Sequence, residues 1–468
     1  MNSKASCIAL FGSGSDVGKS VVAAALCRIF SDIGLKVAPF KTQNMSNNSY
    51  VTASGGEMGR AQVVQAECAR IEPRVDMNPL LLKPSANCRS QMILHGIATG
   101  DVSSTDFRSD RSELFEKLME SLEKLRGDYE LVVIEGAGSC SEVNLRDYDI
   151  ANFRTAARCG APVLLVADID RGGIFAQVTG TLQLLEPEER KLVKGIIINR
   201  FRGDPKLFDD GIKFLEKKTG LPVLGLVPYF NGIDIEPEDS LPLENITDPP
   251  NILRDGMINI AVIRLPHISN FTDFGSLMRE PSVNLSYLSR PGTLDGLNLV
   301  ILPGTKNVLS DLGWLKKTGW AKKVKEYAKN SGNVAGICGG YQMLGNKLSD
   351  PHGMEGGGKA DGLGLLDVTT ELQEEKQLRR VEGWWIENKI PVSGYEIHMG
   401  KTKPAGSGNP AVEITGGGNA NRTDGARSAS GKVWGSYLHG IFDAAKFRNY
   451  YLQTVAPDVE LRFSEDVD

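Results

Sequence analysis

The sequence predicts an α/β protein of two domains, each built on a parallel sheet covered by helices. Short runs rich in Val, Ile and Leu alternate with longer amphipathic segments, an order typical of strands joined by crossover helices. At 468 residues the chain is too long for one ordinary core, because domains usually span about 100 to 200 residues. Between residues 242 and 256 the alternation gives way to a stretch rich in Pro, Asn and Asp, where we expect the domain boundary.

The first expected strand, at residues 8–11, leads into a glycine-rich loop and then an amphipathic helix. Apolar residues at helical spacing predict one buried stripe on this helix, formed by Val22, Ala25, Leu26, Ile29, Phe30 and Ile33. Further strands of the first half are expected at 37–40, 131–134, 163–167, 195–198 and 223–227. The second half repeats the alternation, with strands expected at 258–263, 299–302 and 334–337. We therefore expect a nucleotide-binding domain at 1–245, a linker at 246–257, a second domain at 258–455 and a tail at 456–468.

Composition excludes several classes of function. A net charge of -5 gives no basic footprint for nucleic acid. No apolar run approaches the roughly 20 residues that cross a bilayer, so we expect no membrane partner. The 7 cysteines form no C-x-x-C pair and are typical of reduced thiols, which predicts a cytoplasmic location. We expect small-molecule substrates, and the oligomeric state cannot be inferred from the sequence.

Gly12-Ser-Gly-Ser-Asp-Val-Gly-Lys-Ser20 has the sequence and the strand–loop–helix context of a phosphate-binding loop. In such loops backbone N–H groups and the helix dipole face the phosphates, while the lysine reaches the outer phosphates and the serine hydroxyl reaches Mg²⁺. The sequence therefore predicts an ATP site with Mg²⁺. Its expected nucleotide contacts are Gly12, Ser15, Asp16, Gly18, Lys19 and Ser20.

Three polar residues follow other expected strands of the first half. Glu135 ends the run Leu131-Val-Val-Ile-Glu-Gly-Ala-Gly138, where a carboxylate can hold Mg²⁺ at the open edge of a sheet. Lys41 comes directly after one strand, and Asn199 ends another. The alternatives are a strand-end glutamate that faces solvent, a surface lysine and an ordinary turn residue.

Gly336-Ile-Cys-Gly-Gly340 is a cysteine elbow at the expected turn from a strand to a helix. Flanking glycines tolerate the tight backbone and leave room for a substrate, so Cys338 is the candidate nucleophile. His439, in Tyr437-Leu-His-Gly440, is the candidate base. Gly304 and Gly339 are expected to supply oxyanion N–H donors. The alternative is that Cys338 is a small buried core residue.

The glycine-rich loop departs from the common pattern, because Ser13 stands where a glycine is usual. It resembles the loop G-x-x-[ST]-x-x-G-K-[ST] of dethiobiotin synthetase and its relatives. That resemblance implies a carboxyl group activated by ATP, with Glu135 as a metal ligand, Lys41 in contact with the substrate's activated carboxyl group and Asn199 at the adenine.

The second half, from about residue 258 to 450, resembles the class I glutamine amidotransferases. This resemblance implies a flavodoxin-like fold in which Cys338 attacks the side-chain carbonyl of glutamine and His439 transfers protons. Members of that class carry a glutamate two residues after the histidine, where this chain has Ile441. Glu396 and His398 are candidates for the missing third member, since alternation along a strand puts both on one face; that face could instead line a domain interface.

Several longer blocks resemble the cobyric acid synthase family. They are Lys41-Thr-Gln-Asn-Met-Ser-Asn-Asn48, Asn78-Pro-Leu-Leu-Leu-Lys-Pro84, Asp168-Ile-Asp-Arg-Gly-Gly-Ile-Phe175, the segment 394–400 and Tyr437-Leu-His-Gly-Ile-Phe-Asp443. This resemblance implies amidation of the b, d, e and g carboxylates of adenosylcobyrinic acid a,c-diamide, in adenosylcobalamin biosynthesis. The alternatives are a cobyrinic acid a,c-diamide synthase, a ligase that amidates a cell-wall precursor, and a nucleotide-switched binding protein with an inert amidase domain.

Overall fold

The computed structural model describes residues 4–84, 89–103, 111–230, 253–404, 406, 409–415 and 422–461. Most of the expected linker at 246–257 and the end of the expected tail at 456–468 lie outside these residues. Contacts divide the chain into two compact units: unit 1 comprises Met1–Ser46 and Gly56–Glu236, and unit 2 comprises Asn47–Gly55 and Pro237–Asp468. We call the segment Asn47–Gly55 the arm. It belongs to unit 2, although the expected division assigns it to the first domain.

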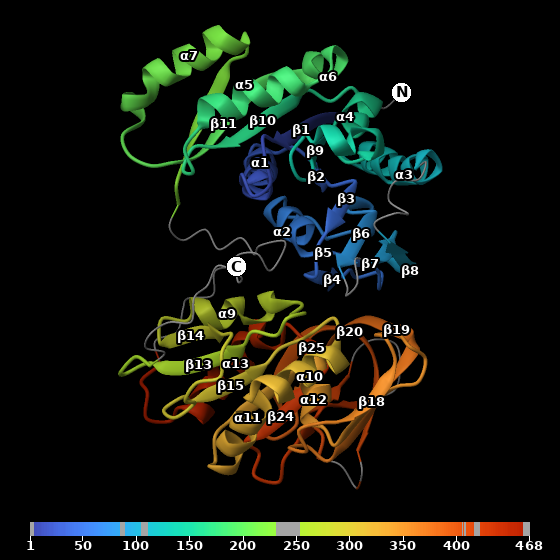
Figure 1. Cartoon of the computed structure of the whole chain (residues 1–468), viewed down its shortest axis with the longest axis vertical. Helices are drawn as coiled ribbons and strands as arrows, with labels where there is room; N and C mark the ends of the chain where they lie inside the picture. Colours follow the sequence, from blue (N-terminus) through green and yellow to red (C-terminus); the bar gives the residue numbers. More distant parts are fainter. Residues whose placement is uncertain are drawn as a thin grey trace. The chain divides into compact units, whose positions relative to one another are not determined.

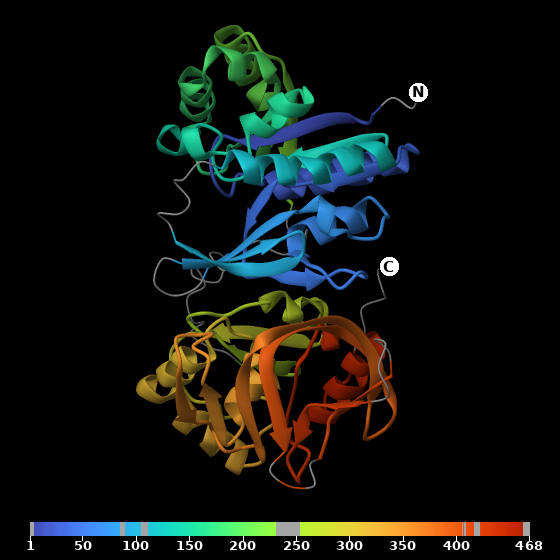
Figure 2. The same cartoon turned by 90° about the vertical axis from the view of Figure 1, so that its right-hand side faces the viewer.

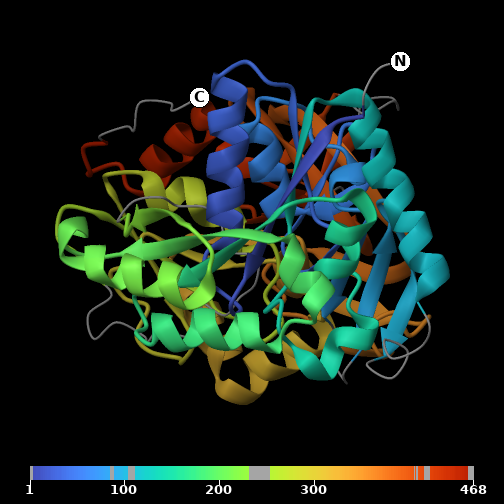
Figure 3. The same ribbon diagram turned by 90° about the horizontal axis from the view of Figure 1, so that it is seen from above.

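A six-stranded parallel sheet forms the centre of unit 1, in the order β12-β11-β10-β1-β9-β2. Its strands are β1 (Ser6–Gly12), β2 (Val37–Phe40), β9 (Leu131–Glu135), β10 (Val163–Asp168), β11 (Val193–Phe201) and β12 (Val223–Pro228). Each coincides with or contains an expected strand, and β1 lies centrally (Figure 3). Helices α1 (Lys19–Asp32) and α5 (Ile174–Leu184) lie on opposite faces of this sheet (Figure 1).

Helix α1 buries a different stripe from the predicted one. Val22 is buried as expected, but Ile29 and Ile33 are 54% and 69% exposed. The buried positions are instead Lys19, Val22, Ala23, Ala24 and Cys27. Small side chains let the helix lie close to both the sheet and α2 (Arg60–Cys68), so the packed face is set by short residues and not by the largest apolar ones.

Unit 1 also contains a smaller sheet that the sequence did not predict, in the order β3-β6-β7-β8. Its strands are β3 (Gln43–Met45), β6 (Leu80–Pro84), β7 (Arg89–Leu94) and β8 (Ile97–Ser103). Unit 1 also contains the short strand β5 (Glu57–Gly59) and the α-helices α3 (Ser112–Asp128), α4 (Phe153–Cys159), α6 (Pro187–Leu192) and α7 (Asp209–Thr219). Its short 3₁₀ helices are η1 (Val75–Met77), η3 (Val143–Tyr148) and η4 (Pro205–Phe208).

Unit 2 is built on a second six-stranded sheet, in the order β14-β13-β15-β16-β24-β23, parallel except for the pair β23–β24. Its strands are β13 (Ile258–Ile263), β14 (Val283–Leu288), β15 (Leu299–Leu302), β16 (Val334–Ile337), β23 (Ala426–Arg427) and β24 (Val433–Ser436). The three strands expected in this half coincide with β13, β15 and β16. The α-helices are α9 (Gly275–Arg279), α10 (Val308–Thr318), α11 (Trp320–Lys329), α12 (Gly339–Leu344) and α13 (Ala445–Val455), and the short 3₁₀ helices are η5 (Phe271–Phe274) and η6 (Ile441–Asp443).

A seven-stranded sheet in unit 2 follows the order β18-β17-β19-β20-β25; in addition, β21 pairs with β19, and β22 pairs with β21. Its strands are β17 (Lys347–Asp350), β18 (Gly358–Asp361), β19 (Val368–Trp385), β20 (Ile390–Pro404), β21 (Val412–Ile414), β22 (Arg422–Asp424) and β25 (Leu438–His439). Figure 2 shows β19 and β20, in orange, as a long curved ribbon. The arm carries one short strand, β4 (Ser49–Val51). Within the described part of the chain, no helix combines the length and apolar character needed to cross a bilayer.

Candidate functional site

Cys338 lies at the turn between β16 and α12, in the elbow that the sequence predicted. Its φ of 50° and ψ of -108° are uncommon for a residue other than glycine and indicate local strain. A Cβ atom at Gly340 would lie 1.9 Å from the carbonyl oxygen of Leu302, and one at Gly336 would lie 2.8 Å from the carbonyl carbon of Gly340. The glycines are therefore required for close packing, which fixes the cysteine at the carboxyl end of the sheet.

His439 is held by a carboxylate that the sequence analysis did not identify. Its Nδ1 atom lies 2.7 Å from Oδ2 of Asp273, and both side chains are only 2% exposed. The backbone N–H of Gly440 donates to the other oxygen of Asp273 at 3.1 Å. Asp273 therefore fixes the orientation of the imidazole ring, which is the role of the third member in a nucleophile–histidine–acid triad.

Burial alone would lower the pKa of His439. The negative charge of Asp273 and interactions with Cys338, together with hydrogen bonds to both residues, outweigh burial and raise this pKa to about 10. An imidazole with a raised pKa can accept and hold the proton that a thiol releases when it attacks a carbonyl carbon. Cys338, His439 and Asp273 thus form a buried group suited to thiol chemistry on an amide.

The predicted stand-ins for the third member are wrong. The carboxylate of Glu396 pairs with Arg379 at 3.0 Å and with Arg422 at 2.6 Å. His398 stacks on Tyr437 with ring centroids 3.6 Å apart, and burial lowers the pKa of His398 to about 3. The sequence does carry a signal for Asp273, because the mostly polar segment 269–273 comes after the first strand of the second half, and functional side chains often gather where parallel strands end.

Gly304 and Gly339 lie beside the histidine and the cysteine. Gly304 follows β15, and a Cβ atom built on it would lie 3.1 Å from Cε1 of His439. Gly339 is the first residue of α12, directly after Cys338, and a Cβ atom there would lie 2.6 Å from Cγ2 of Thr305. Their position agrees with that of oxyanion donors, which stays a prediction.

Glu135 is the centre of a second buried group, in unit 1. It ends β9 and lies beside Leu10 of β1. Its carboxylate accepts hydrogen bonds from Oγ of Ser20 at 2.9 Å, Nζ of Lys41 at 2.9 Å and Nε2 of Gln65 at 2.6 Å. Burial alone would raise the pKa of Glu135, but the charge of Lys41 and the hydrogen bonds from Lys41 and Gln65 lower it, so the group is ionised at neutral pH. The structure therefore brings together Ser20, Lys41 and Glu135, while their contacts with metal and substrate stay predictions.

Lys19 is buried and lies across the glycine-rich loop. Its ammonium group donates to the carbonyl oxygen of Gly14 at 3.1 Å and to that of Gly138 at 2.8 Å. A Cβ atom at Gly12 would lie 2.9 Å from Nζ of this lysine and 2.7 Å from the carbonyl oxygen of Gly14. Gly12 thus leaves the space in which the loop and its lysine can approach a phosphate closely.

The other predicted nucleotide contacts surround the same loop. Gly18 precedes α1 with a φ of 90°, and a Cβ atom there would lie 2.1 Å from Nδ2 of Asn199. Asn199 donates from Nδ2 to the carbonyl oxygen of Val17 at 2.9 Å and so braces the loop. The hydroxyl of Ser15 lies 3.9 Å from the Cβ position of Gly138. Adenine recognition by Asn199 stays a prediction.

Asp16 pairs with two arginines on the rim of the loop. Its carboxylate lies 2.5 Å from Arg171 and 3.3 Å from Arg200, and its side chain is 58% exposed. Arg200 also pairs with the buried carboxylate of Asp168 at 2.8 Å. These ion pairs tie the loop to the ends of β10 and β11, and a nucleotide contact by Asp16 stays a prediction.

The atoms around Glu135 fit a hard divalent cation. Mg²⁺ prefers oxygen ligands and usually takes only one or two carboxylates from the protein. Oγ of Ser20 and Oε1 of Glu135 are 2.9 Å apart. Oε1 of Gln65 is buried and has no hydrogen-bond partner among the described residues. These oxygens lie at the end of the glycine-rich loop, where a metal-bound nucleotide would bring its phosphates.

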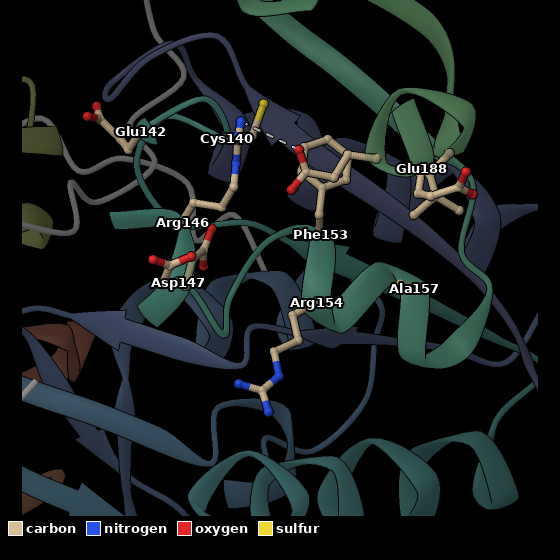
Figure 4. Close-up of a pocket in the computed structure, with 11 residues that line it drawn as sticks. Cys140, Glu142, Arg146, Asp147, Phe153, Arg154, Ala157 and Glu188 are labelled. Atoms are coloured by element: carbon tan, nitrogen blue, oxygen red, sulfur yellow. Dashed lines mark ion pairs between the residues drawn. The ribbon is translucent and has the colours of Figure 1, made fainter. Parts of the chain in front are cut away.

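A pocket of about 270 Å³ lies next to the loop after Glu135 (Figure 4). Its wall includes Cys140, whose backbone N–H donates to the carbonyl oxygen of Gly12 at 3.0 Å. Acidic side chains outnumber basic ones in its lining, which contains Glu142, Asp147, Asp149, Glu188 and Glu189 beside Arg146 and Arg154. Arg146 is already paired with Glu186 at 2.7 Å and Glu189 at 3.7 Å. This charge pattern is a poor match for phosphate, so the candidate nucleotide site is the glycine-rich loop and not this pocket.

Two domain families match the chain. Residues 8–243 match the CobQ/CobB/MinD/ParA nucleotide binding domain, and residues 259–447 match the CobB/CobQ-like glutamine amidotransferase domain. The first match contains the group around Glu135, and the second contains Cys338, His439 and Asp273.

Similar proteins match the chain over nearly its full length. The cobyric acid synthase of Chlorobium phaeobacteroides (strain BS1) is 54% identical over 96% of this chain and 92% of that protein. The cobyric acid synthase of Chlorobaculum tepidum is 50% identical over 98% of this chain and 96% of that protein. The cobyric acid synthase of Pelotomaculum thermopropionicum is 49% identical over 96% of this chain and 87% of that protein. The chain belongs to the cobyric acid synthase family.

Proposed function

We propose that this chain uses ATP and the amide nitrogen of glutamine to amidate the b, d, e and g carboxylates of adenosylcobyrinic acid a,c-diamide. The observation that carries this proposal is the presence of two chemically different buried sites in one chain of this family. The group around Cys338 is suited to release ammonia from glutamine, and the group around Glu135 is suited to activate a carboxylate with ATP.

The amidase reaction follows from the triad. The sulfur of Cys338 attacks the side-chain carbonyl carbon of glutamine, and His439 takes the thiol proton and passes it to the departing nitrogen, which leaves as ammonia. Asp273 keeps the imidazole oriented and stabilises its charged form. The backbone N–H groups of Gly304 and Gly339 stabilise the negative oxygen of the tetrahedral intermediate. Water then cleaves the thioester, which yields glutamate and restores the thiol.

The synthetase reaction uses the loop and the carboxylate cluster. Ser20 and Glu135 would hold Mg²⁺, which would supply charge stabilisation to the phosphates. Lys19 exchanges its carbonyl partners for the outer phosphates, and Lys41 orients the substrate carboxylate. The carboxylate oxygen takes the terminal phosphoryl group of ATP, and ADP leaves. Ammonia attacks the resulting acyl phosphate, and inorganic phosphate departs with loss of a proton from nitrogen.

The cytoplasm is the compartment that suits these groups best. The described cysteines, Cys7, Cys27, Cys68, Cys140, Cys159 and Cys338, are all free thiols. A cysteine nucleophile works only while it is reduced, and cytosolic conditions keep thiols reduced. The substrates are small molecules in this proposal: the corrinoid, glutamine and ATP.

The nearest alternative is a cobyrinic acid a,c-diamide synthase, which would use the same chemistry on other carboxylates. Similar proteins at 49% to 54% identity carry the name cobyric acid synthase, which favours the proposed substrate. A nucleotide-switched binding protein with an inert amidase domain is not favoured, because the histidine and its carboxylate partner are both present beside Cys338.

The test is to supply the purified chain with glutamine, ATP, Mg²⁺ and either corrinoid, and to follow the products by chromatography and mass spectrometry. With adenosylcobyrinic acid a,c-diamide we expect successive amides that end at cobyric acid. Activity only on the acid that lacks the a and c amides would assign the chain to diamide synthesis. Glutamine hydrolysis with no reaction of either corrinoid would refute the substrate.

A further inference from the structure

The arm comes from the N-terminal half of the sequence but packs within unit 2. The chain before it, up to Ser46, and the chain after it, from Gly56, belong to unit 1. Val51 is fully buried, with 0% exposure, and forms one apolar cluster with Tyr395 and Ile397 of β20. The N-terminal half therefore contributes core residues to the unit that carries the triad.

The ring of Tyr395 lies between Tyr50 of the arm and His439 and contacts both. The rings of Tyr50 and Tyr395 meet edge to face, with centroids 5.0 Å apart. Tyr395 in turn stacks on His439, with centroids 5.4 Å apart and planes inclined by 15°, and these two residues are also paired across β20 and β25. Aromatic packing of this kind restricts the tilt of the imidazole, so the position of Tyr50 affects the position of His439.

The backbone of the arm is bonded to Asn270, which directly precedes the 3₁₀ helix η5 that carries Asp273. The N–H of Ser49 donates to Oδ1 of Asn270 at 3.1 Å. Asn270 has a φ of 49° and a buried side chain, and its carbonyl oxygen accepts the N–H of Asp273 at 3.0 Å. A shift of the arm would therefore move the start of η5, the helix that positions the acid of the triad.

The apolar cluster also extends to the cysteine. Ile397, which packs in one cluster with Val51, accepts at its carbonyl oxygen a hydrogen bond from Sγ of Cys338 at 3.5 Å. Arg380 holds the arm on this cluster, because its Nε donates to the carbonyl oxygen of Val51 at 3.0 Å and its guanidinium lies 5.0 Å from the ring centre of Tyr50. The arm thus touches a direct neighbour of each of the three triad residues.

We propose that the arm is a positioning element for the amidase triad and that Tyr50 is its principal positioning residue, acting on His439 through Tyr395. This inference rests on the proposed glutaminase function of unit 2. Lys41, at the carboxylate cluster of unit 1, precedes the arm in the sequence by only a few residues, so glutamine cleavage depends on a segment that is covalently close to the synthetase site.

The test compares the full-length wild type with Tyr50→Ala, Tyr50→Phe and Ala53→Ser, the last a control at an exposed position of the same arm. Glutamine hydrolysis is measured for kcat and KM, and amidation is measured with ammonium as nitrogen source. Misplacing a catalytic group by about 1 Å can lower the reaction rate about 10²-fold. We therefore expect Tyr50→Ala to lower kcat for glutamine hydrolysis about 10- to 100-fold. KM for glutamine and ammonium-dependent amidation stay close to wild type.

Rescue by Tyr50→Phe distinguishes positioning by the ring from other roles. The phenyl ring keeps the contact with Tyr395, so this variant and Ala53→Ser should hydrolyse glutamine nearly as fast as the wild type. A wild-type kcat in Tyr50→Ala, or a Tyr50→Phe enzyme as slow as Tyr50→Ala, would overturn the inference. If the wild type hydrolyses no glutamine, or if Cys338→Ala still does, the proposed function itself fails instead.

A second variant covers the case in which Tyr50→Ala does not fold. Asn270→Gly removes the acceptor of the Ser49 N–H while glycine tolerates the positive φ at this position. It leaves the contact between Tyr50 and Tyr395 in place. We expect a fall in kcat for glutamine with intact ammonium-dependent amidation, and an unchanged kcat in this variant would contradict the proposal.

Discussion

The two buried groups of this chain differ in what their residues bind in the structure. In unit 2, Cys338 is held at a strained elbow, and His439 is hydrogen-bonded to Asp273, which fixes the orientation of the imidazole ring. In unit 1, the groups expected to meet ligands bind one another or the backbone: Ser20 and Lys41 both donate to Glu135. Lys19 likewise donates to two carbonyl oxygens of its own loop region.

This difference indicates how each site begins its reaction. The amidase group keeps its internal hydrogen bonds when glutamine binds, because Asp273 acts on His439 and not on the substrate. The synthetase group has to exchange partners, since Lys19 and Ser20 can reach phosphate or metal only by leaving the oxygens that they now contact. We therefore expect unit 2 to behave as a preorganised site and unit 1 as a site that is completed by its substrates.

The largest expected effect comes from Lys19→Ala. Loss of the ammonium group removes the main positive charge from the loop, so amidation should fall about 10²- to 10³-fold with either glutamine or ammonium. Glutamine hydrolysis measured alone should survive. Lys19 is a better target than Lys41, because removing one partner of the buried Lys41–Glu135 pair costs about 3 to 5 kcal/mol of stability and would confuse folding with catalysis.

The control for this variant is Lys36→Ala, at an exposed lysine before β2. It should amidate at the wild-type rate. Normal ammonium-dependent amidation by Lys19→Ala would mean that the glycine-rich loop is not the nucleotide site and would remove the contrast between the two units.

A smaller effect is expected from Asp273→Asn, and it is specific to glutamine. The amide keeps the shape of the side chain but not its charge, so it stabilises the imidazolium less and lowers the pKa of His439 from its value of about 10. The protonated form of His439 is then lost at lower pH as pH rises. The alkaline limb of kcat/KM for glutamine hydrolysis should move to lower pH, with a loss of about 10- to 100-fold at neutral pH.

Asp295→Asn, at an exposed carboxylate of unit 2, provides the matched control and should leave the pH profile unchanged. Ammonium-dependent amidation should be equal in the wild type and in both variants. An unchanged alkaline limb in Asp273→Asn would show that Asp273 does not set the protonation of His439, and unit 2 would then not be preorganised in the way described.

Much of the fold of unit 1 could be predicted from the sequence, and so could the candidate roles of Cys338 and His439, because their sequence signals are local. The strands follow from short apolar runs, and a glycine-rich loop between a strand and a helix identifies Lys19 and Ser20 within a few residues. Glu135 and Lys41 were found by their position directly after strands, since the ends of neighbouring parallel strands meet at one edge of the sheet. Cys338 was found by the glycines that its elbow requires.

The missed features depend on contacts between distant segments. Asp273 precedes His439 by 166 residues, and their contact requires the order of β13, β15, β16 and β24 in the sheet. The stripe on α1 was mispredicted because a helix between a sheet and a second helix buries short side chains and can leave Ile29 exposed. The arm was assigned to the first domain by sequence position, whereas the partners of Val51 are decided by tertiary packing alone.

The most direct test of the central claim, that one chain cleaves glutamine at Cys338 and uses the released nitrogen at its ATP site, is an isotope measurement. The enzyme is given adenosylcobyrinic acid a,c-diamide, ATP, Mg²⁺, amide-¹⁵N glutamine and unlabelled ammonium, and the isotope content of the new amides is read by mass spectrometry. We predict mostly ¹⁵N in products of the wild type and of the control Cys68→Ala, and only unlabelled nitrogen in products of Cys338→Ala, which keeps the ammonium-dependent reaction. Mostly unlabelled amides from the wild type, or ¹⁵N amides from Cys338→Ala, would contradict the account.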